Sequence, residues 1–118
     1  MSVRLETNVG DFVVDLFTSD APKACFNFLK LCKLNYYAYS IFLRLEAGFL
    51  LQGGDPTNTG KGGESIWNVL NPEDKSLRFF TQEIDVSKRK HSLRGTLSMA
   101  SAGKDRNASQ FFFTLADD

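Results

Sequence analysis

Residues 42–55 have the sequence Phe-Leu-Arg-Leu-Glu-Ala-Gly-Phe-Leu-Leu-Gln-Gly-Gly-Asp, an apolar, strand-like stretch that carries the isolated polar side chains of Arg44 and Gln52. A second apolar stretch, residues 95–113, carries Gln110 in the same kind of setting. Burying part of an arginine or a glutamine costs free energy unless its donors find acceptors. An apolar strand surface with one guanidinium and two amides therefore indicates a pocket that binds a peptide backbone.

The sequence around these stretches predicts a mainly β fold with one helix. Residues 3–7 and 11–17 flank the turn Asn8-Val9-Gly10 and predict an N-terminal hairpin. Ser19-Asp20-Ala21-Pro22 predicts a helix start with a capping side-chain oxygen, and the helical spacing of apolar residues ends near Asn35. Further strands are expected at residues 41–45, 49–53, 95–100 and 109–115. Short strands between long loops favour an antiparallel β-barrel with a helix over one mouth.

Two loops separate the later strands. The first, residues 53–63, is rich in glycine, but Gly62 stands where a phosphate-binding loop needs a serine or threonine, and the glycine spacing is also wrong. We therefore expect no nucleotide at this loop. The second, residues 68–92, is polar and irregular, with Phe79-Phe80 as its expected apolar anchor.

Length and charge limit the class of protein. The 118 residues suffice for a single domain, 1–118, and 42% of them are apolar, enough for a core. The 14 basic and 14 acidic residues balance, so no long-range field directs nucleic acid or an anionic membrane to this chain. No apolar run reaches the ~18–20 residues of a membrane span, and the N-terminus lacks a signal-peptide pattern. We expect an intracellular protein, cytoplasmic or nuclear.

Both cysteines, Cys25 and Cys32, fall in the predicted helix. At about 1.5 Å of rise per residue, their Cα atoms are roughly 10 Å apart, beyond the ~7 Å limit for a disulfide. The spacing predicts free thiols in a reducing compartment. No set of residues has the spacing of metal ligands, and we expect no metal and no cofactor.

Three ordered motifs resemble those of the cyclophilins, the peptidyl-prolyl cis-trans isomerases. They are the Phe-x-Arg-x-x-x-Gly-Phe-x-x-Gln-Gly-Gly-Asp pattern of residues 42–55, Gly60-Lys-Gly-Gly-Glu-Ser-Ile66, and Leu97-Ser-Met-Ala…Gly…Asn…Ser-Gln-Phe-Phe112. The resemblance covers residues 3–113 and implies the cyclophilin-like antiparallel β-barrel capped by a helix. It also implies a domain that is incomplete at its C-terminus, without the last two strands, the second helix and the far wall of the pocket. Among cyclophilins, the chain is most similar to nuclear members that carry an RNA-recognition domain downstream.

The resemblance implies a reaction and the residues that perform it. Rotation about an X-Pro bond, which assists protein folding, needs a site that binds the twisted imide more tightly than either planar form. Arg44 would donate to the prolyl nitrogen and Gln52 would hold the substrate backbone, so these two are the implied catalytic residues. Gln110 would brace Arg44 or the bound peptide, and the backbone of Ser101 would pair with the substrate. The apolar slot for the proline ring would consist of Phe49, Leu50, Ala100 and Phe112.

Other readings remain open at this point. Ser101 stands where the family usually has asparagine, and Leu43 where it usually has histidine. With the far wall absent, the alternative is a non-catalytic module that binds proline peptides in a larger assembly, for example a spliceosomal one. A third reading is a fragment that self-associates instead of folding to a functional monomer. The expected partners are proline-containing peptides and proteins, with cyclosporin-type ligands as candidates, and neither nucleic acid nor membrane.

Overall fold

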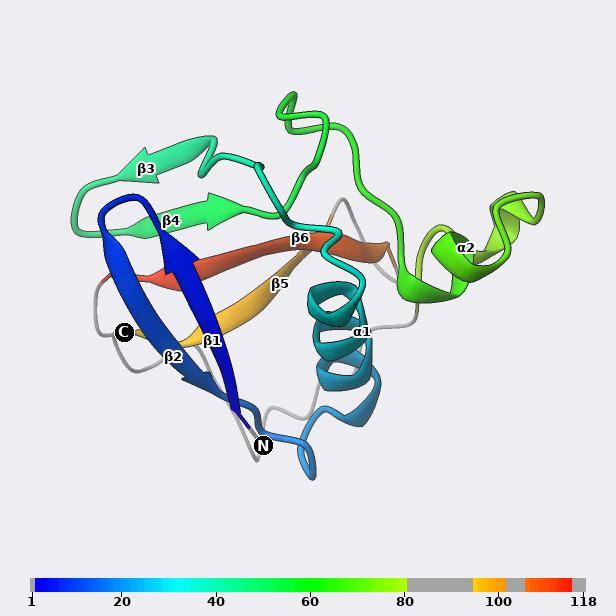
Figure 1. The fold of residues 1–118 in the computed structure, drawn as a ribbon, viewed down its shortest axis with the longest axis horizontal. Helices are drawn as coiled ribbons and strands as arrows, with labels where there is room; N and C mark the ends of the chain where they lie inside the picture. The colour runs from blue at the N-terminus through cyan, green and yellow to red at the C-terminus, as the bar shows by residue number, and fades with distance from the viewer. Residues whose placement is uncertain (1, 81–94, 102–105, 116–118) are drawn as a thin grey trace.

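The computed structural model describes residues 2–80, 95–101 and 106–115, with the side chain of Ser101 left out. Its described strands form two antiparallel sheets, one of two strands and one of four, the latter in the order β3-β4-β6-β5. Figure 1 shows the N-terminal hairpin and α1 beside the four-stranded sheet. The elements are β1 (Ser2–Thr7), β2 (Gly10–Asp15), α1 (Pro22–Lys33), β3 (Arg44–Glu46), β4 (Leu50–Gly53), α2 (Ile66–Leu70), the 3-10 turn η1 (Lys75–Leu77), β5 (Leu97–Ser101) and β6 (Asn107–Thr114).

The mainly β class with a helix packed on the sheet is confirmed. Within the described residues the strands do not close into one ring, because β1 and β2 pair only with each other while β3 and β5 are the outer strands of the larger sheet. The predicted side-chain cap of the helix is wrong. The N-cap is Ala21, whose side chain has no oxygen to accept a hydrogen bond, so of the predicted signals only Pro22 in the first turn is used. The helix ends at Lys33, slightly before the predicted end.

The core lies where α1 and the hairpin meet one face of β6. Alternation along β6 places Phe111 and Phe113 on this face. The ring of Phe111 packs edge-on against Phe28 of α1, with centroids 5.4 Å apart, and the ring of Phe113 packs against Phe12 of β2 at 5.3 Å. Phe111 and Phe113 therefore belong to the core, and Phe112 is left on the other face of the sheet.

One buried polar residue ties three elements together. Asn27 of α1 is fully buried. Its Nδ2 donates to the carbonyl of Ala108 in β6, and its Oδ1 accepts from the N–H of Ile66 at the start of α2, both at 2.7 Å. Because both halves of the amide are satisfied, its burial is compatible with a stable core. This pair of bonds sets the position of α1 relative to β6.

The segment after α2 is anchored as predicted. Phe80 is buried, its N–H donates to the carbonyl of Asn107 at 2.9 Å, and its ring contacts Trp67 of α2. Trp67 also stacks on Phe26 of α1, so its indole belongs to the contact between the helices. The remainder of the predicted loop, residues 81–92, lies outside the described residues.

Candidate functional site

Strand register brings the two principal candidates together. Arg44 of β3 lies directly opposite Gln52 of β4, and Gln52 lies opposite Phe112 of β6. Directly opposed residues of antiparallel strands present their side chains on the same face, with Cβ atoms about 4.5–5.5 Å apart. Arg44, Gln52 and Phe112 therefore form a row across the sheet, on the face opposite the Phe111 and Phe113 core. We call this face the site face.

Gln110 braces Gln52. The Nε2 of Gln52 donates to the Oε1 of Gln110 at 3.0 Å, and the Nε2 of Gln110 donates to the carbonyls of Gly60 and Gly62 at 3.1 and 2.9 Å. Gln110 thus links the site face to the glycine-rich loop. In the described residues, the side-chain bonds of Gln110 go to Gln52 and the two glycine carbonyls, and its expected role of bracing Arg44 or the bound peptide stays a prediction.

Arg44 has a partner that sequence reasoning missed. Its Nε and Nη2 both donate to the Oε1 of Glu46, at 3.1 and 2.6 Å, and the two side chains are 50% and 45% exposed. Alternation places residues two apart on the same face of a strand. That spacing, an arginine and a glutamate separated by one residue within a predicted strand, was the signal in the sequence. Arg44 therefore pairs along its own strand, while Gln52 pairs across to Gln110.

The glycine-rich loop is organised around the carboxylate of Asp55, which is fully buried. Burial alone raises the pKa of this carboxyl, but bonds from the Thr57 hydroxyl and from the N–H groups of Gly62, Thr57 and Gly60 outweigh it and lower the pKa to about 2. These N–H groups are the donors that a bound phosphate would need. The carboxylate of Asp55 occupies them instead.

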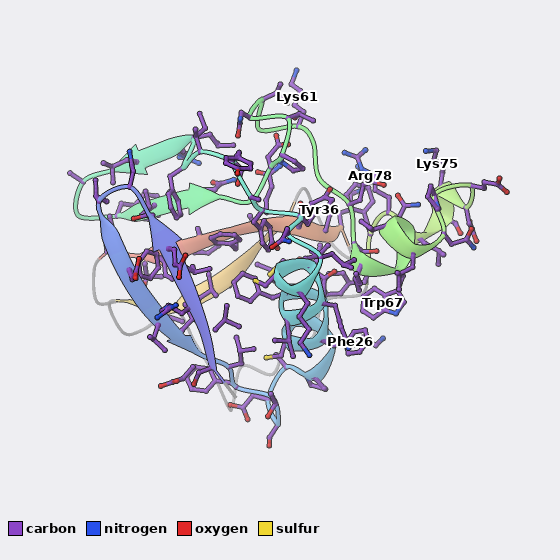
Figure 2. All side chains as sticks on the ribbon, in the orientation of Figure 1. Phe26, Tyr36, Lys61, Trp67, Lys75 and Arg78 are labelled. Carbon is purple, nitrogen blue, oxygen red and sulfur yellow. The ribbon has the colours of Figure 1, made fainter. Side chains whose placement is uncertain are left out.

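The loop is also attached at its far end. Arg78 donates from Nη2 to the carbonyl of Lys61 at 2.8 Å and from Nε to that of Gly63 at 3.2 Å. Figure 2 shows Lys61 at the tip of this loop, with Arg78 on the segment after α2. The loop whose carbonyls receive Gln110 is therefore held from two sides, by Asp55 at the N–H groups of Gly60 and Gly62 and by Arg78 at the carbonyls of Lys61 and Gly63.

Only some of the residues predicted for the apolar slot lie together on the site face. Leu50 is buried and lies on the site face, two residues before Gln52. Phe49 is 56% exposed and sits in the turn between β3 and β4, where its N–H donates to the carbonyl of Glu46. Ala100 is half-buried at the point where the β5–β6 register shifts, and the side chain of Ser101 is outside the described residues. Of the predicted slot residues, Phe112 thus lies in the row and Leu50 lies beside it on the same face.

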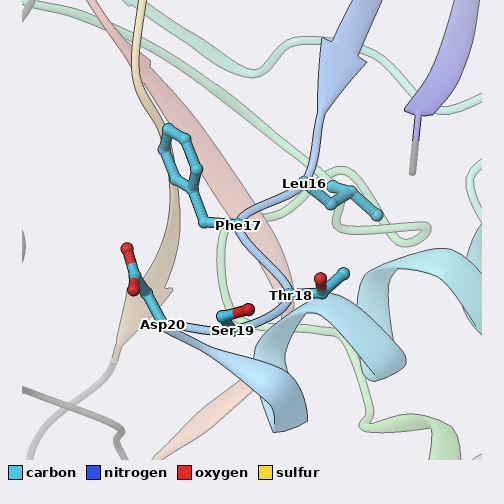
Figure 3. A pocket seen from close by; sticks show the side chains of 5 residues that line it. All are labelled: Leu16, Phe17, Thr18, Ser19 and Asp20. Carbon is cyan, nitrogen blue, oxygen red and sulfur yellow. The ribbon is translucent and has the colours of Figure 1, made fainter.

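Other features of the described residues offer little chemistry. The cavity in Figure 3 is lined by Leu16, Phe17, Thr18, Ser19 and Asp20, a single loop between β2 and α1 that shares no residue with the site face. Both cysteines are free, and burial raises the pKa of the Cys32 thiol to about 11, so it stays protonated.

In the part of the chain that the structure describes, no group of His, Cys, Asp and Glu residues is suited to hold a metal ion. Over the same part, no helix is long and apolar enough to cross a membrane.

Comparison with known proteins points to one family. The family model described as cyclophilin type peptidyl-prolyl cis-trans isomerase/CLD matches residues 2–118. The human peptidyl-prolyl cis-trans isomerase-like 4 is 47% identical over 118 residues, which cover 100% of this chain and 23% of that protein. The Dictyostelium discoideum peptidyl-prolyl cis-trans isomerase-like 3 is 51% identical over 114 residues, 97% of this chain and 65% of that protein. The chain therefore spans about a quarter of the human relative (23%) and most of the Dictyostelium one.

A solved structure shares the fold. A Cryptosporidium parvum cyclophilin type peptidyl-prolyl cis-trans isomerase, crystallised in the presence of the dipeptide Ala-Pro, superposes with a TM-score of 0.88 at 47% identity. The match covers 100% of this chain and 70% of that protein. The arrangement of strands and helix described above is thus the arrangement found in that protein over the matched part.

Proposed function

Because this chain belongs to the family of cyclophilin-type peptidyl-prolyl cis-trans isomerases, we propose that it catalyses rotation about X-Pro peptide bonds in protein substrates and thereby assists protein folding. The observation that carries this proposal is the row on the site face, where Arg44, Gln52 and Phe112 are neighbours on three adjacent strands. A guanidinium, an amide and an aromatic ring at this spacing match the three parts of an X-Pro segment: the imide, the backbone and the proline ring.

In this proposal each residue has one role. Twisting the imide removes its resonance and leaves a lone pair on the prolyl nitrogen, so a donor there stabilises the transition state more than either planar form. Arg44 is that donor, and Gln52, braced by Gln110, holds the substrate backbone. Phe112, Leu50, Phe49 and Ala100 contact the proline ring, while the backbone of Ser101 pairs with the residue before proline. No cofactor takes part.

The proposed partners are proline-containing peptides and proteins, and the Ala-Pro dipeptide present with the Cryptosporidium relative is of this class. Binding of cyclosporin-type ligands and a place in a larger, for example spliceosomal, assembly stay predictions, as does a downstream RNA-recognition domain. The free cysteines suit a reducing compartment inside the cell. One observation favours a non-catalytic peptide-binding module as the second candidate, since Arg44 is already paired with Glu46.

Two-dimensional NMR exchange on an excess of a blocked Ala-Pro-Phe peptide tests the proposal. The uncatalysed cis and trans forms interchange over tens of seconds, too slowly for exchange cross-peaks at sub-second mixing times. We expect the chain to produce these cross-peaks. Shifted peptide resonances without exchange would favour the binding module, and a scattering mass far above 13.2 kDa would favour self-association.

Replacement of Gln110 by alanine is expected to lower kcat/KM by about tenfold, because Gln52 then loses its brace and samples orientations that do not hold the peptide. The same assay measures the change. Gln110→Glu is the matched variant, since a carboxylate still accepts from Gln52 but no longer donates to the glycine carbonyls. Substantial recovery in Gln110→Glu would show that the bond to Gln52 matters most, whereas full activity of Gln110→Ala would remove Gln110 from the site.

A further inference from the structure

The contact between Arg44 and Glu46 has consequences for the proposed reaction. Two of the guanidinium's N–H donors converge on a single carboxylate oxygen, the Oε1 of Glu46. Arg44 lies opposite Gln52, and Glu46 lies opposite Leu50, so both side chains project over the site face. The guanidinium is thus directed along β3 toward Glu46, and the row that would receive a peptide lies across the strands.

We propose that Glu46 is a built-in counter-ion that competes with the substrate for Arg44 and so attenuates the isomerase. This inference rests on the proposed function, because it takes Arg44 as the group that acts on the X-Pro bond. Glu46 touches neither the substrate nor the reacting atoms in this scheme. It is a positioning residue that acts through Arg44.

Geometry and charge together favour competition over productive support. A residue that supported catalysis would bind N–H groups of Arg44 that the substrate does not use. Alternatively, it would be a buried group that holds the guanidinium in one orientation. Glu46 instead takes donors on the exposed side of the sheet, and about half of each side chain is accessible to solvent (50% and 45%). Its negative charge also lowers the positive potential that a prolyl nitrogen lone pair would meet at Arg44. A substrate must therefore displace or share this carboxylate.

The solvent exposure of the Arg44–Glu46 ion pair sets the expected size of its effect on the rate. Exposed ion pairs stabilise proteins weakly and are screened by salt, so the competition is modest and reversible. We expect removal of the charge in Glu46→Gln to raise kcat/KM for a neutral peptide by roughly two- to fivefold at low ionic strength. The chain supplies a matched control. Arg4 and Glu6 of β1 form an ion pair with the same spacing, at 2.8 Å, on the separate two-stranded sheet.

The experiment compares the parent chain, Glu46→Gln and Glu6→Gln in the NMR exchange assay with the blocked Ala-Pro-Phe peptide. The peptide's Kd comes from 15N chemical-shift titration of each variant. We expect Glu46→Gln to be faster and Glu6→Gln to equal the parent. Salt provides a readout that a merely structural role would not move, because raising NaCl from ~10 mM to ~0.5 M shortens the screening length several-fold. The parent should approach the Glu46→Gln rate as salt rises, and the advantage of the variant should shrink.

Each outcome decides the matter. A slower or unchanged Glu46→Gln, or an advantage that does not depend on salt, overturns the counter-ion role. Binding without turnover in every variant defeats the isomerase proposal alone, and tighter peptide binding by Glu46→Gln would still support Glu46 as the competitor. Equal or weaker binding in that case overturns it. Absence of both binding and turnover in all variants overturns both proposals.

Discussion

Arg44→Ala is expected to lower kcat/KM for an Ala-Pro peptide by on the order of 100-fold, because the substitution removes the donor that we propose for the twisted imide. The fold should persist. Arg44 is half-exposed on β3, an outer strand, and its side-chain hydrogen bonds within the described residues are both to Glu46. Exchange cross-peaks in the NMR assay measure the rate, and urea denaturation measures the free energy of unfolding, which should change by no more than about 0.5 kcal/mol.

Two variants bracket this result. Arg44→Lys keeps the charge but loses the planar fork of donors, so its activity should lie between those of the parent and Arg44→Ala. Arg4→Ala removes an arginine from the equivalent ion pair on β1 and should leave the rate unchanged. If Arg44→Ala is as active as the parent, Arg44 is not the electrostatic catalyst, and the isomerase mechanism proposed above is wrong.

Asp55→Ala is expected to reduce the free energy of unfolding by about 3 kcal/mol, because it leaves several loop N–H groups without their acceptor. The carboxylate receives the N–H groups of Thr57, Thr59, Gly60 and Gly62 at 2.9, 3.1, 2.7 and 3.1 Å. Urea denaturation measures the loss. Asp11→Ala, an exposed residue at the start of β2, is the control and should change the stability by less than about 0.5 kcal/mol.

The pH dependence of Asp55→Asn tests the same carboxylate separately. The pKa of Asp55 is lowered from 3.8 to about 2, so its charge stabilises the fold fully above the ordinary pKa and the contribution is lost as pH falls toward 2. The parent should therefore be more stable than Asp55→Asn at pH 6, and the difference should narrow between pH 4 and pH 2. A difference that stays constant over this range would mean that packing, and not the charge, accounts for the effect.

The predictions for Asp55 and Arg44 differ in their effect on activity and stability, because hydrogen bonds through Gln110 connect Asp55 to the site face. Asp55 holds the N–H groups of Gly60 and Gly62, and the carbonyls of the same two glycines receive the amide of Gln110. Gln110 in turn holds Gln52. Loss of Asp55 should consequently lower activity as well as stability, whereas loss of Arg44 should lower activity alone.

Much of this architecture could be predicted from local patterns. The hairpin, the helix and the later strands follow from alternation, helical spacing and turn residues, because these patterns reflect which face of an element is buried. The helix cap could not be predicted, since Ser19 and Asp20 are good capping residues and only the path of the chain decides that Ala21 occupies the cap. The bracing of Gln110 was likewise out of reach, because Gln110 and the loop at Gly60 are far apart in sequence and meet only when β4 and β6 pair.

The sequence by itself determined the family, the mainly β class and the identity of Arg44, Gln52 and Phe112 as candidates, because a guanidinium and amides in apolar strands need partners wherever the fold places them. Only the tertiary structure decided how those partners are assigned. Strand register set Arg44 opposite Gln52. The side chains then formed hydrogen bonds to other neighbours, Gln52 to Gln110 and Arg44 to Glu46. Alternation limits which residues share a face, but the choice among neighbours on that face depends on distances that exist only after the sheet has formed.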